Sequence, residues 1–186
     1  PLLTTAMKSV GEAMAIGRSF AESIQKGLRS METGLNGFNE VEIEGAIVDG
    51  ELNRDAVRAA LSERRPERIR YIAQAMRLGM PDDEIQRACG YDTWFLDQIR
   101  AIVEAEEVVR ANGMPEEALG VLRLKKMGFS DERLAELTHG SATQIARERR
   151  AHGVRPVYKR VDTCAGEFAS QTSYMYSCYE GNGSRH

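Results

Sequence analysis

The sequence predicts a mostly α-helical protein, an irregular multi-helix domain of about seven or eight short helices with short extended flanking segments. Three observations predict this fold class. Apolar residues recur at helical spacing almost throughout residues 53–153. Glycine and proline interrupt that pattern at short intervals, and Ser, Asp or Asn precede several of its segments. Helices this short and this often interrupted are not typical of a four-helix bundle.

The N-terminal part is expected to hold one helix between two non-helical stretches. Residues 4–16 are rich in small and apolar side chains and indicate a short extended segment. Ser19 to Glu22 has the order of a capping box, which begins a helix. Its apolar stripe, expected to end near Gly34, consists of Phe20, Ile24, Leu28 and Met31. Residues 33–52 contain four glycines and many acids, which indicates a loop or linker and the best domain boundary.

The central region is expected to be a series of capped helices. Each begins at a residue that suits a helix N-terminus: Asn53, Pro66, Pro81, Asp92, Pro115, Ser130 or Ser141. Most are expected to stop at a glycine, namely Gly79, Gly90, Gly113, Gly128 or Gly153. Leu119, Leu122 and Leu124 are the apolar residues of the helix after Pro115. Beyond Pro156 the helical periodicity stops, so an extended segment is expected there.

The longest predicted helix follows Asp92 and carries two large aromatic residues in its first turn. We expect Trp94 and Phe95 to be core residues, because large aromatics at such positions usually are, although at an interface they would act as anchors. The acidic run Glu104–Glu107 on the same helix is expected to face solvent.

An internal repeat is visible at an offset of 49 residues. Residues 77–85, RLGMPDDEI, resemble residues 126–134, KMGFSDERL. Each segment leads through a glycine into a helix that begins at Asp92 or Ser141. Two explanations remain open, convergence of short helical hairpins on one spacing and duplication.

Composition describes an ordinary globular protein and excludes several classes. The chain is 42% apolar, and its net charge of −3 gives no general attraction to nucleic acid or anionic membranes. Three widely spaced cysteines favour free thiols in a reducing cytoplasm. No apolar run is long enough to span a bilayer, and residues 1–5, PLLTT, do not resemble a signal peptide. The start at Pro1 suggests a piece of a longer protein, and residues 181–186 suggest a flexible tail.

The sequence predicts no catalytic, cofactor-binding or metal-ligating residue in this chain. None of His139, His152 and His186 has a partner at metal-ligand spacing, such as a second histidine at i, i+4 with a nearby acid. Cys164 has no histidine close in sequence, so a small buried thiol is the simpler interpretation. No glycine-rich phosphate-binding motif is present.

A helix-turn-helix DNA-binding protein is the alternative function, and it would use residues 128–150. The second helix of this segment offers polar and basic side chains for a DNA groove, namely Thr143, Gln144, Arg147, Arg149 and Arg150. The first helix is acidic, however, and the chain lacks a basic footprint. A packed helical hairpin with a solvated basic face therefore explains the segment better.

Two blocks follow no simple hydrophobic pattern and carry a family resemblance. Residues 156–168, PVYKRVDTCAGEF, and residues 7–18, MKSVGEAMAIGR, closely resemble the large chain of carbamoyl phosphate synthetase at the junction of its two ATP-using halves. Residues 68–75, 94–99 and 174–177 extend the resemblance, which runs from Thr4 to about Glu180. Gly166 departs from it, because the family is expected to have alanine there.

The resemblance implies that this chain is a non-catalytic helical oligomerisation and linker domain. Residues 1–32 would be the tail of the first, carboxyphosphate-forming half, residues 33–158 the oligomerisation domain, and residues 159–186 the lead-in to the second, carbamoyl-phosphate-forming half plus the tail. The implied parent is a cytoplasmic ligase that makes carbamoyl phosphate from bicarbonate, ammonia from glutamine, and ATP, for arginine and pyrimidine biosynthesis.

The same resemblance implies partners and cofactors. Self-association, the flanking synthetic domains and a glutaminase small subunit are the expected partners, with no nucleic acid and no membrane. ATP, Mg²⁺ or Mn²⁺, and K⁺ would belong to the parent enzyme, and none is expected to bind this part. Residues 1–18 and 163–186 are expected to be less protected from hydrogen exchange than the helical body, because their parent sheets lie elsewhere.

Overall fold

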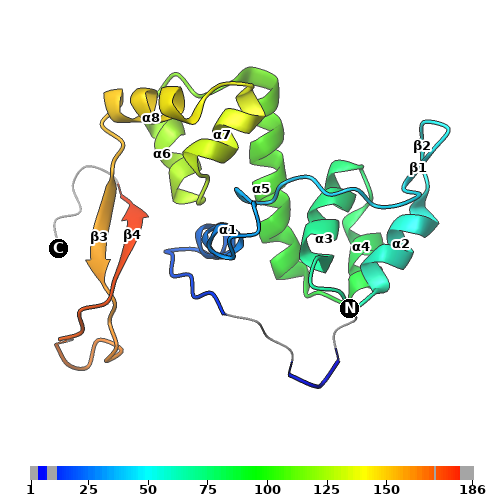
Figure 1. Cartoon of the computed structure of the whole chain (residues 1–186), viewed down its shortest axis with the longest axis horizontal. Helices are drawn as coiled ribbons and strands as arrows, with labels where there is room; N and C mark the ends of the chain where they lie inside the picture. Colours follow the sequence, from blue (N-terminus) through cyan, green and yellow to red (C-terminus); the bar gives the residue numbers. More distant parts are fainter. Residues whose placement is uncertain (1–3, 8–11, 170, 181–186) are drawn as a thin grey trace. The chain divides into compact units, whose positions relative to one another are not determined.

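The computed structural model describes residues 4–7, 12–169 and 171–180, and it confirms the mostly helical fold class (Figure 1). The expected tail at 181–186 lies outside the described residues. The helices are α1 (Phe20–Ser30), α2 (Arg54–Ser62), α3 (Arg68–Arg77), α4 (Asp82–Cys89), α5 (Thr93–Asn112), α6 (Ala118–Lys126), α7 (Asp131–Thr138) and α8 (Ala142–Ala151). Two antiparallel hairpins complete the fold, β1 (Ile47–Val48) with β2 (Glu51–Leu52) and β3 (Pro156–Arg160) with β4 (Met175–Tyr179).

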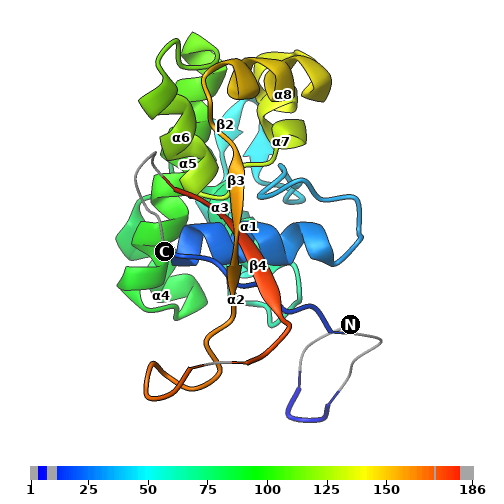
Figure 2. The ribbon, with the colours of Figure 1, turned by 90° about the vertical axis from the view of Figure 1, so that its left-hand side faces the viewer.

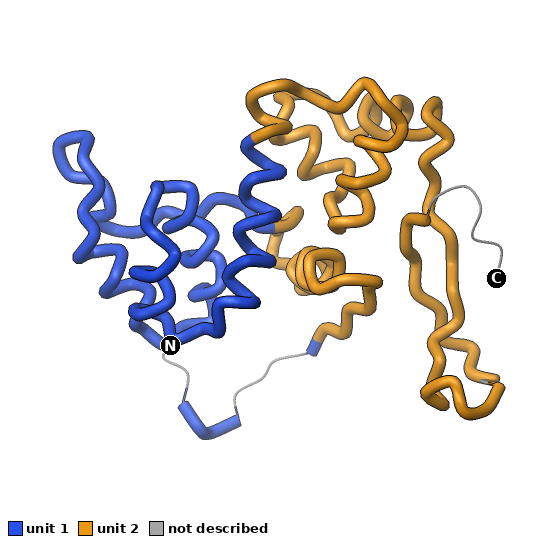
Figure 3. The backbone as a smooth tube through the Cα atoms, turned by 180° about the vertical axis from the view of Figure 1, so that it is seen from behind, with its two compact units in different colours: residues 1–12, 38–107 blue, residues 13–37, 108–186 orange. Residues whose placement is uncertain are grey.

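The chain divides into two compact units (Figure 3). Unit 1 comprises residues 1–12 and 38–107, and unit 2 comprises residues 13–37 and 108–186. The division at residue 37 falls inside the glycine-rich stretch that the sequence suggested as a boundary. That stretch is not a loose linker, however, because Phe38, Ile43 and Ala46 are buried.

Unit 1 is built on helices α2, α3 and α4, which pack on one another. Its core is made of side chains that recur at helical spacing, including Val57, Leu61, Ile72, Met76, Ile85, Leu96 and Ile99. A buried ion pair joins two helices of this unit, with Arg77 Nη2 lying 2.6 Å from Glu106 Oε2. Glu106 is fully buried. The expectation that the whole acidic run faces solvent is therefore wrong at this residue.

Unit 2 contains α6, α7 and α8, helix α1 and the β3–β4 hairpin. In the hairpin, Pro156 pairs with Tyr179 and Arg160 with Met175. Figure 2 shows α1 crossing the hairpin, and β4 also contacts α6. An isolated two-stranded hairpin is marginal in water, so β4 depends on these contacts for its order.

The capping residues expected from sequence act as predicted at most helix starts. Ser19, Asn53, Ser130 and Ser141 each accept a hydrogen bond from the backbone N–H three residues later. Asp92 Oδ1 accepts from the N–H of Trp94 at 2.9 Å. These bonds satisfy donors that a helix N-terminus otherwise leaves unpaired.

The 49-residue repeat extends to helix ends, caps and an ion pair. Helices α4 and α7 begin and end 49 residues apart, and so do the starts of α5 and α8. The N–H of Met80 donates to Ala75 O, and the N–H of Phe129 donates to Leu124 O. Left-handed C-caps follow at Gly90 and, 49 residues later, at His139. Agreement at this level of detail favours duplication over convergence.

The most specific part of the repeat is its ion pair. Asp82 pairs with Arg100 in the first copy, and Asp131 pairs with Arg149 in the second, each partner displaced by 49 residues. The first copy lies in unit 1 and the second in unit 2. Unrelated helical hairpins are not expected to share an ion pair that joins α4 to α5 in one copy and α7 to α8 in the other.

Several sequence expectations are wrong in detail. Helices α3 and α6 begin at Arg68 and Ala118, because Pro66 and Pro115 lie in the turns before them. Helix α1 ends at Ser30 and leaves Met31 exposed, since its buried side carries Ala21, Glu22, Gln25 and Leu28 instead. Leu119 is also exposed.

Trp94 and Phe95 are not core residues, because their side chains are 51% and 41% exposed. The buried side of α5 is set by Leu96, Ile99 and Val103, which recur at helical spacing. Trp94 lies on the opposite side of the helix from Leu96, about 200° around it. Phe95 lies on the same side as Ile99 and Ile102 but in the first turn of α5, where its side chain is 41% exposed.

Candidate functional site

A cluster of buried and half-buried charges in unit 2 is the most elaborate polar arrangement of the described residues. We call it the α1 junction. It comprises Glu22, Gln25, Lys26 and Arg29 of α1, Lys125 of α6, Asp131 of α7, Arg149 of α8 and residues 177–179 of β4. Three helices and a strand from distant parts of the chain meet α1 there.

Lys26 is the centre of the α1 junction. Its ammonium group donates to Ile16 O at 2.9 Å and to Ser177 O at 2.5 Å, and it lies 2.8 Å from Glu22 Oε1. A lysine ammonium group has three donors, and two of them make these hydrogen bonds, while the contact with Glu22 is an ion pair. Lys26 thereby connects the extended segment before α1 to strand β4.

The position of Glu22 is determined by the start of α1. As the last residue of the expected capping box it lies one turn before Lys26, where helical i,i+4 pairs meet. Its Oε2 accepts from the N–H of Arg18 at 2.6 Å, one residue before the Ser19 cap. Glu22 is only 2% exposed, so its charge depends on Lys26 and on this backbone donor.

Two further side chains of α1 hold the turn between α6 and α7. Gln25 Nε2 donates to Met127 O at 2.9 Å, and Arg29 Nη1 donates to Gly128 O at 2.5 Å. Helix ends leave carbonyl groups without intrahelical donors, and these two contacts satisfy such groups just after α6. A Cβ atom on Gly128 would lie 2.8 Å from Glu22 Cα, so the close approach to α1 requires glycine.

Asp131 anchors the other half of the junction. It receives Lys125 Nζ at 2.8 Å and Arg149 Nη2 at 2.9 Å. Burial raises the pKa of Asp131, but hydrogen bonds from Arg149 and Lys125 outweigh burial and leave the pKa below its ordinary value. Burial lowers the pKa of Lys125, against the opposing effect of Asp131.

Tyr179 of β4 covers this ion cluster. The centroid of its ring lies 5.2 Å from Lys125 Nζ and 5.6 Å from Arg149 Cζ, within the range of cation–π attraction. Burial raises the pKa of the Tyr179 hydroxyl. The β3–β4 hairpin is thus held to the helices through polar and aromatic contacts at Ser177 and Tyr179.

The α1 junction encloses a small hollow of about 270 Å³. The charged residues of its lining are balanced, with cations at Lys26, Arg29 and Lys125 and anions at Glu22, Asp131 and Glu132. Such a lining has no net attraction for an anion or a cation. The charged residues around the hollow serve to join segments of the chain.

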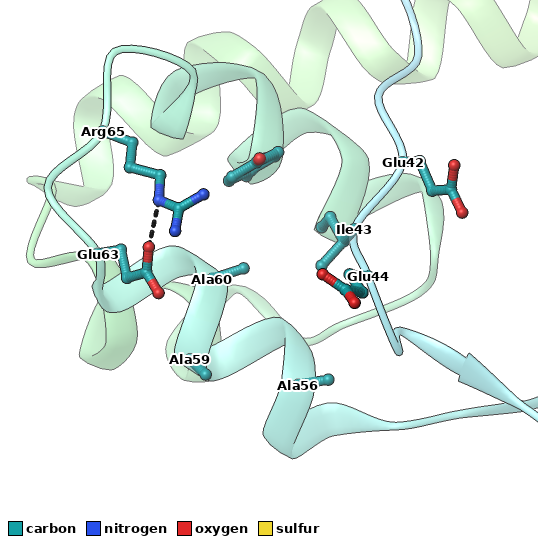
Figure 4. A pocket seen from close by; sticks show the side chains of 9 residues that line it. Glu42, Ile43, Glu44, Ala56, Ala59, Ala60, Glu63 and Arg65 are labelled. Carbon is teal, nitrogen blue, oxygen red and sulfur yellow. Dashed lines mark ion pairs between the residues drawn. The ribbon is translucent and has the colours of Figure 1, made fainter. Parts of the chain in front are cut away.

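Unit 1 has a larger hollow of about 660 Å³ (Figure 4). Methyl groups of Ala56, Ala59 and Ala60 line the α2 side, and the ion pair of Glu63 with Arg65 lies at one edge. Glu42 and Glu44 come from the extended segment opposite. Among the described residues that line it there is no serine, threonine, cysteine, lysine or histidine.

The histidines and Cys164 lie in different elements. His139 forms the C-cap of α7 and His152 that of α8. Cys164, expected to be a buried thiol, is half-buried in the connection between β3 and β4. Within residues 4–7, 12–169 and 171–180, no group of three or more His, Cys, Asp and Glu side chains could hold a metal ion. No helix in the same residues is long and apolar enough to cross a membrane.

The geometry of residues 128–150 gives no support to the DNA-binding alternative. Arg149 is buried, and its guanidinium group is bound to Asp131 and Val154 O. Arg133 is also buried. Two of the arginines of this segment are therefore structural and not available to phosphates.

The family model for the carbamoyl-phosphate synthetase large chain, oligomerisation domain, matches residues 12–153. The chain belongs to this family. A carbamoyl phosphate synthase large chain of Rhizobium meliloti (strain 1021) is 56% identical over 180 residues. The large chain of Brucella melitensis is 54% identical over 180 residues, and that of Vibrio vulnificus is 48% identical over 179.

These alignments cover nearly all of the present chain and a small part of each relative. They span 97% of this chain but 15% of the Rhizobium and Brucella proteins, and 96% of this chain but 16% of the Vibrio protein. The chain therefore matches a small part of large chains that are several times longer. The match extends through α1 to α8, so it includes the helical part of the junction.

Proposed function

We propose that this domain joins the two synthetic halves of a carbamoyl phosphate synthetase large chain and provides surface for self-association. Residues 1–32 would end the first half, residues 33–158 would form the oligomerisation domain, and residues 159–186 would lead into the second half. In this proposal the domain has no catalytic residue of its own.

The α1 junction is the observation that carries the proposal. Lys26 binds the segment before α1 through Ile16 O and strand β4 through Ser177 O. The incoming and outgoing parts of the domain are thereby fastened at one side chain. A connector between two enzyme halves needs such a fastening, because otherwise each half would move on its own linker.

The parent enzyme would be an ATP-dependent ligase that makes carbamoyl phosphate from bicarbonate, ATP and ammonia. A glutaminase small subunit would supply the ammonia from glutamine, and the product would serve arginine and pyrimidine biosynthesis in the cytoplasm. ATP and the ions Mg²⁺ or Mn²⁺ and K⁺ would bind the flanking halves.

Light scattering across a concentration series tests the self-association of this chain. We expect a dimer or larger species that dissociates on dilution. A chain that stays monomeric at every concentration would contradict self-association through this domain. The remaining function would then be that of a connector.

A further inference from the structure

One side of helix α6 in unit 2 borders a hollow of about 630 Å³. Leu119, Arg123 and Lys126 lie along this side at i, i+4 and i+7, and all three are exposed. We call this side the α6 face. Leu119 is 68% exposed. Among the described residues, the side chains of Arg123 and Lys126 have neither an ion-pair nor a hydrogen-bond partner. The α6 face therefore combines an exposed apolar residue with two cations that are available to a partner.

The internal repeat shows what lies along the equivalent side of α3 in unit 1. Forty-nine residues earlier the three positions are occupied by half-buried residues, namely Arg70, Gln74 and Arg77. Arg70 Nη2 donates to Glu40 O at 3.2 Å, and Arg77 Nη2 donates to Phe38 O at 2.5 Å. In the first copy, this side of the helix therefore binds an extended segment, residues 38–41, through its backbone carbonyl groups.

The α6 face offers the same mode of binding in the second copy. Lys126 lies at the position of Arg77, and its ammonium group is a donor for a backbone carbonyl group in the same way. Arg123, one turn earlier, adds further N–H donors. Leu119 takes the position of Arg70, so one end of the face is apolar. A partner that fits is an extended segment with unpaired carbonyl groups and an apolar side chain.

The charge of the hollow defines the segment further. The lining has more cations than acids, with Arg18, Arg123 and Lys126 against Glu22 and Glu180. Each of the two acids already forms an ion pair with a lysine outside this lining. The hollow therefore has a net positive charge and favours acidic side chains. The segment bound to α3 continues as residues 40–44, EVEIE, in which acidic and apolar residues alternate.

The corresponding segment of a second copy is not available to the α6 face. Phe38 and Ile43 are buried within unit 1, so residues 38–44 are already held in their own copy. Their transfer to another copy would expose these two apolar side chains, which is unfavourable. The segment is therefore expected from a part of the protein that this chain does not contain.

The source of the segment follows from the proposed function. Residues 1–32 and 159–186 are the parts proposed to belong to the two synthetic halves, and both contribute to the lining of the hollow, through Ser19 and Tyr179 among others. This chain spans 15–16% of the length of the large chains it matches, so most of such a protein lies outside it.

We propose that an extended acidic segment of a flanking domain of the same large chain binds along the α6 face, as residues 38–41 bind along α3. Arg123 and Lys126 bind its carbonyl and carboxylate groups, and Leu119 contacts an apolar side chain. This inference rests on the proposed function as a connector and names a contact through which it acts.

The first test measures the accessibility of the Lys126 amine. Acetylation by an amine-reactive ester, read by mass spectrometry, is compared between the 186-residue chain and the complete large chain. We expect acetylation of Lys126 to be at least about fivefold slower in the large chain, because a bound segment leaves the amine accessible for only about a fifth of the time. Equal rates in the two proteins would overturn the proposal.

The second test asks whether charge holds the segment. Arg123→Glu in the large chain should bring the acetylation rate of Lys126 to within about twofold of that in the 186-residue chain. Arg147→Glu is the matched control, since Arg147 is an exposed arginine of α8 outside the lining, and it should leave the rate slow. If Lys126 stays slow in both variants, charge at the α6 face does not hold the segment and the proposal is wrong.

Melting temperatures show whether Arg123 acts within the domain or on a partner. Arg123→Glu removes no side-chain bond among the described residues, so the 186-residue variant should melt within about 2 °C of wild type. The same variant of the large chain should melt at least about 4 °C lower. An equal fall in both proteins would assign Arg123 to the stability of unit 2 and contradict the proposal.

A concentration series separates this contact from self-association. If acetylation of Lys126 in the 186-residue chain slows as its mass rises, a second copy covers the α6 face and the proposal is wrong. Self-association itself is measured by mass alone. A large chain that assembles while Lys126 is acetylated freely would therefore contradict this contact and leave the proposed function standing.

Discussion

Lys26 shows how one side chain can join three segments of a protein. Its contacts reach Ile16, Glu22 and Ser177, and they compensate for the partial burial of its charge at 19% exposure. Glu22 is nearly fully buried and relies on the same ammonium group. Loss of Lys26 would therefore leave an acid and two carbonyl groups without this donor.

We predict that Lys26→Met destabilises the chain by roughly 2–3 kcal/mol, because it leaves the buried Glu22 carboxylate without its cation. Urea unfolding measures this change as a lower midpoint at constant slope. Lys126→Met is the matched control, since Lys126 is an exposed lysine on α6, and it should change stability by less than about 0.5 kcal/mol. Similar losses in both variants would refute the role of Lys26.

Asp131 gives a pH-dependent prediction. Its folded-state pKa lies below the ordinary value of 3.8, so its contribution to stability is present above about pH 4 and is lost as the pH falls through the folded pKa. We expect Asp131→Asn to cost about 2 kcal/mol at pH 7, with the difference from wild type shrinking below about pH 4. Urea midpoints measured from pH 7 to pH 3 test this.

Asp82→Asn is the control for Asp131→Asn at the same position of the repeat. The Asp82 side chain is 46% exposed, compared with 16% for Asp131. Exposed ion pairs contribute little, so the control should cost less than about 1 kcal/mol at pH 7. A cost equal to that of Asp131→Asn would mean that burial does not distinguish the two pairs.

At the scale of elements, the 49-residue repeat places the same glycine-containing turn in two different environments. Gly79 and Gly128 both follow a helix with positive φ, at +80° and +94°. Around Gly79 no atom lies within 4 Å of an added Cβ, whereas a Cβ added to Gly128 would clash with the backbone of Glu22. The first turn thus needs glycine for its conformation, and the second needs it also for the approach of α1.

We predict that Gly79→Ala costs about 1 kcal/mol and Gly128→Ala at least about 3 kcal/mol. The difference arises from the contact at 2.8 Å between the new Cβ and Glu22 Cα. Thermal and urea unfolding of both variants measure it. Equal costs would show that the turn conformation alone determines the effect and that α1 can move aside.

An element could be predicted from the sequence where the interactions that determine it lie close together along the chain. The caps at Ser19, Asn53 and Ser130 depend on residues within one turn, and sequence reasoning found them. The burial of Glu106 and the exposure of Trp94 depend on which side of α5 meets the rest of the unit, which residue types alone do not determine. The β3–β4 hairpin was expected only as an extended segment, because its pairing joins residues separated by a long connection.

The α1 junction was missed for the same reason, although one pattern pointed to part of it. Asp82 with Arg100 and Asp131 with Arg149 recur at the 49-residue offset that the glycines had already revealed. Extending the repeat along the chain would have identified both ion pairs. The local i,i+4 pattern identifies only the ion pair of Lys26 with Glu22, because the two carbonyl partners of Lys26 lie 10 and 151 residues away.

At the scale of the whole molecule, protection from hydrogen exchange should be uneven. Residues 161–169 and 171–174, between β3 and β4, are largely exposed, and these described residues contain no helix or strand. The buried residues of α5 belong to a continuous helix of 20 residues. We predict that amides of 163–169 exchange far faster than those of α5, as read by mass spectrometry. Equal protection would contradict this.

The contact between Lys26 and Ser177 also has a consequence for the order of folding during synthesis. The two residues are separated by 151 positions, so the ribosome completes Ser177 about 8–30 s after Lys26 at ordinary elongation rates. Throughout that interval the residues of α1 lack their contacts with strand β4. The residues of helices α6 to α8 are also made before those of β4, so the hairpin is the last element of the α1 junction whose partners are all present.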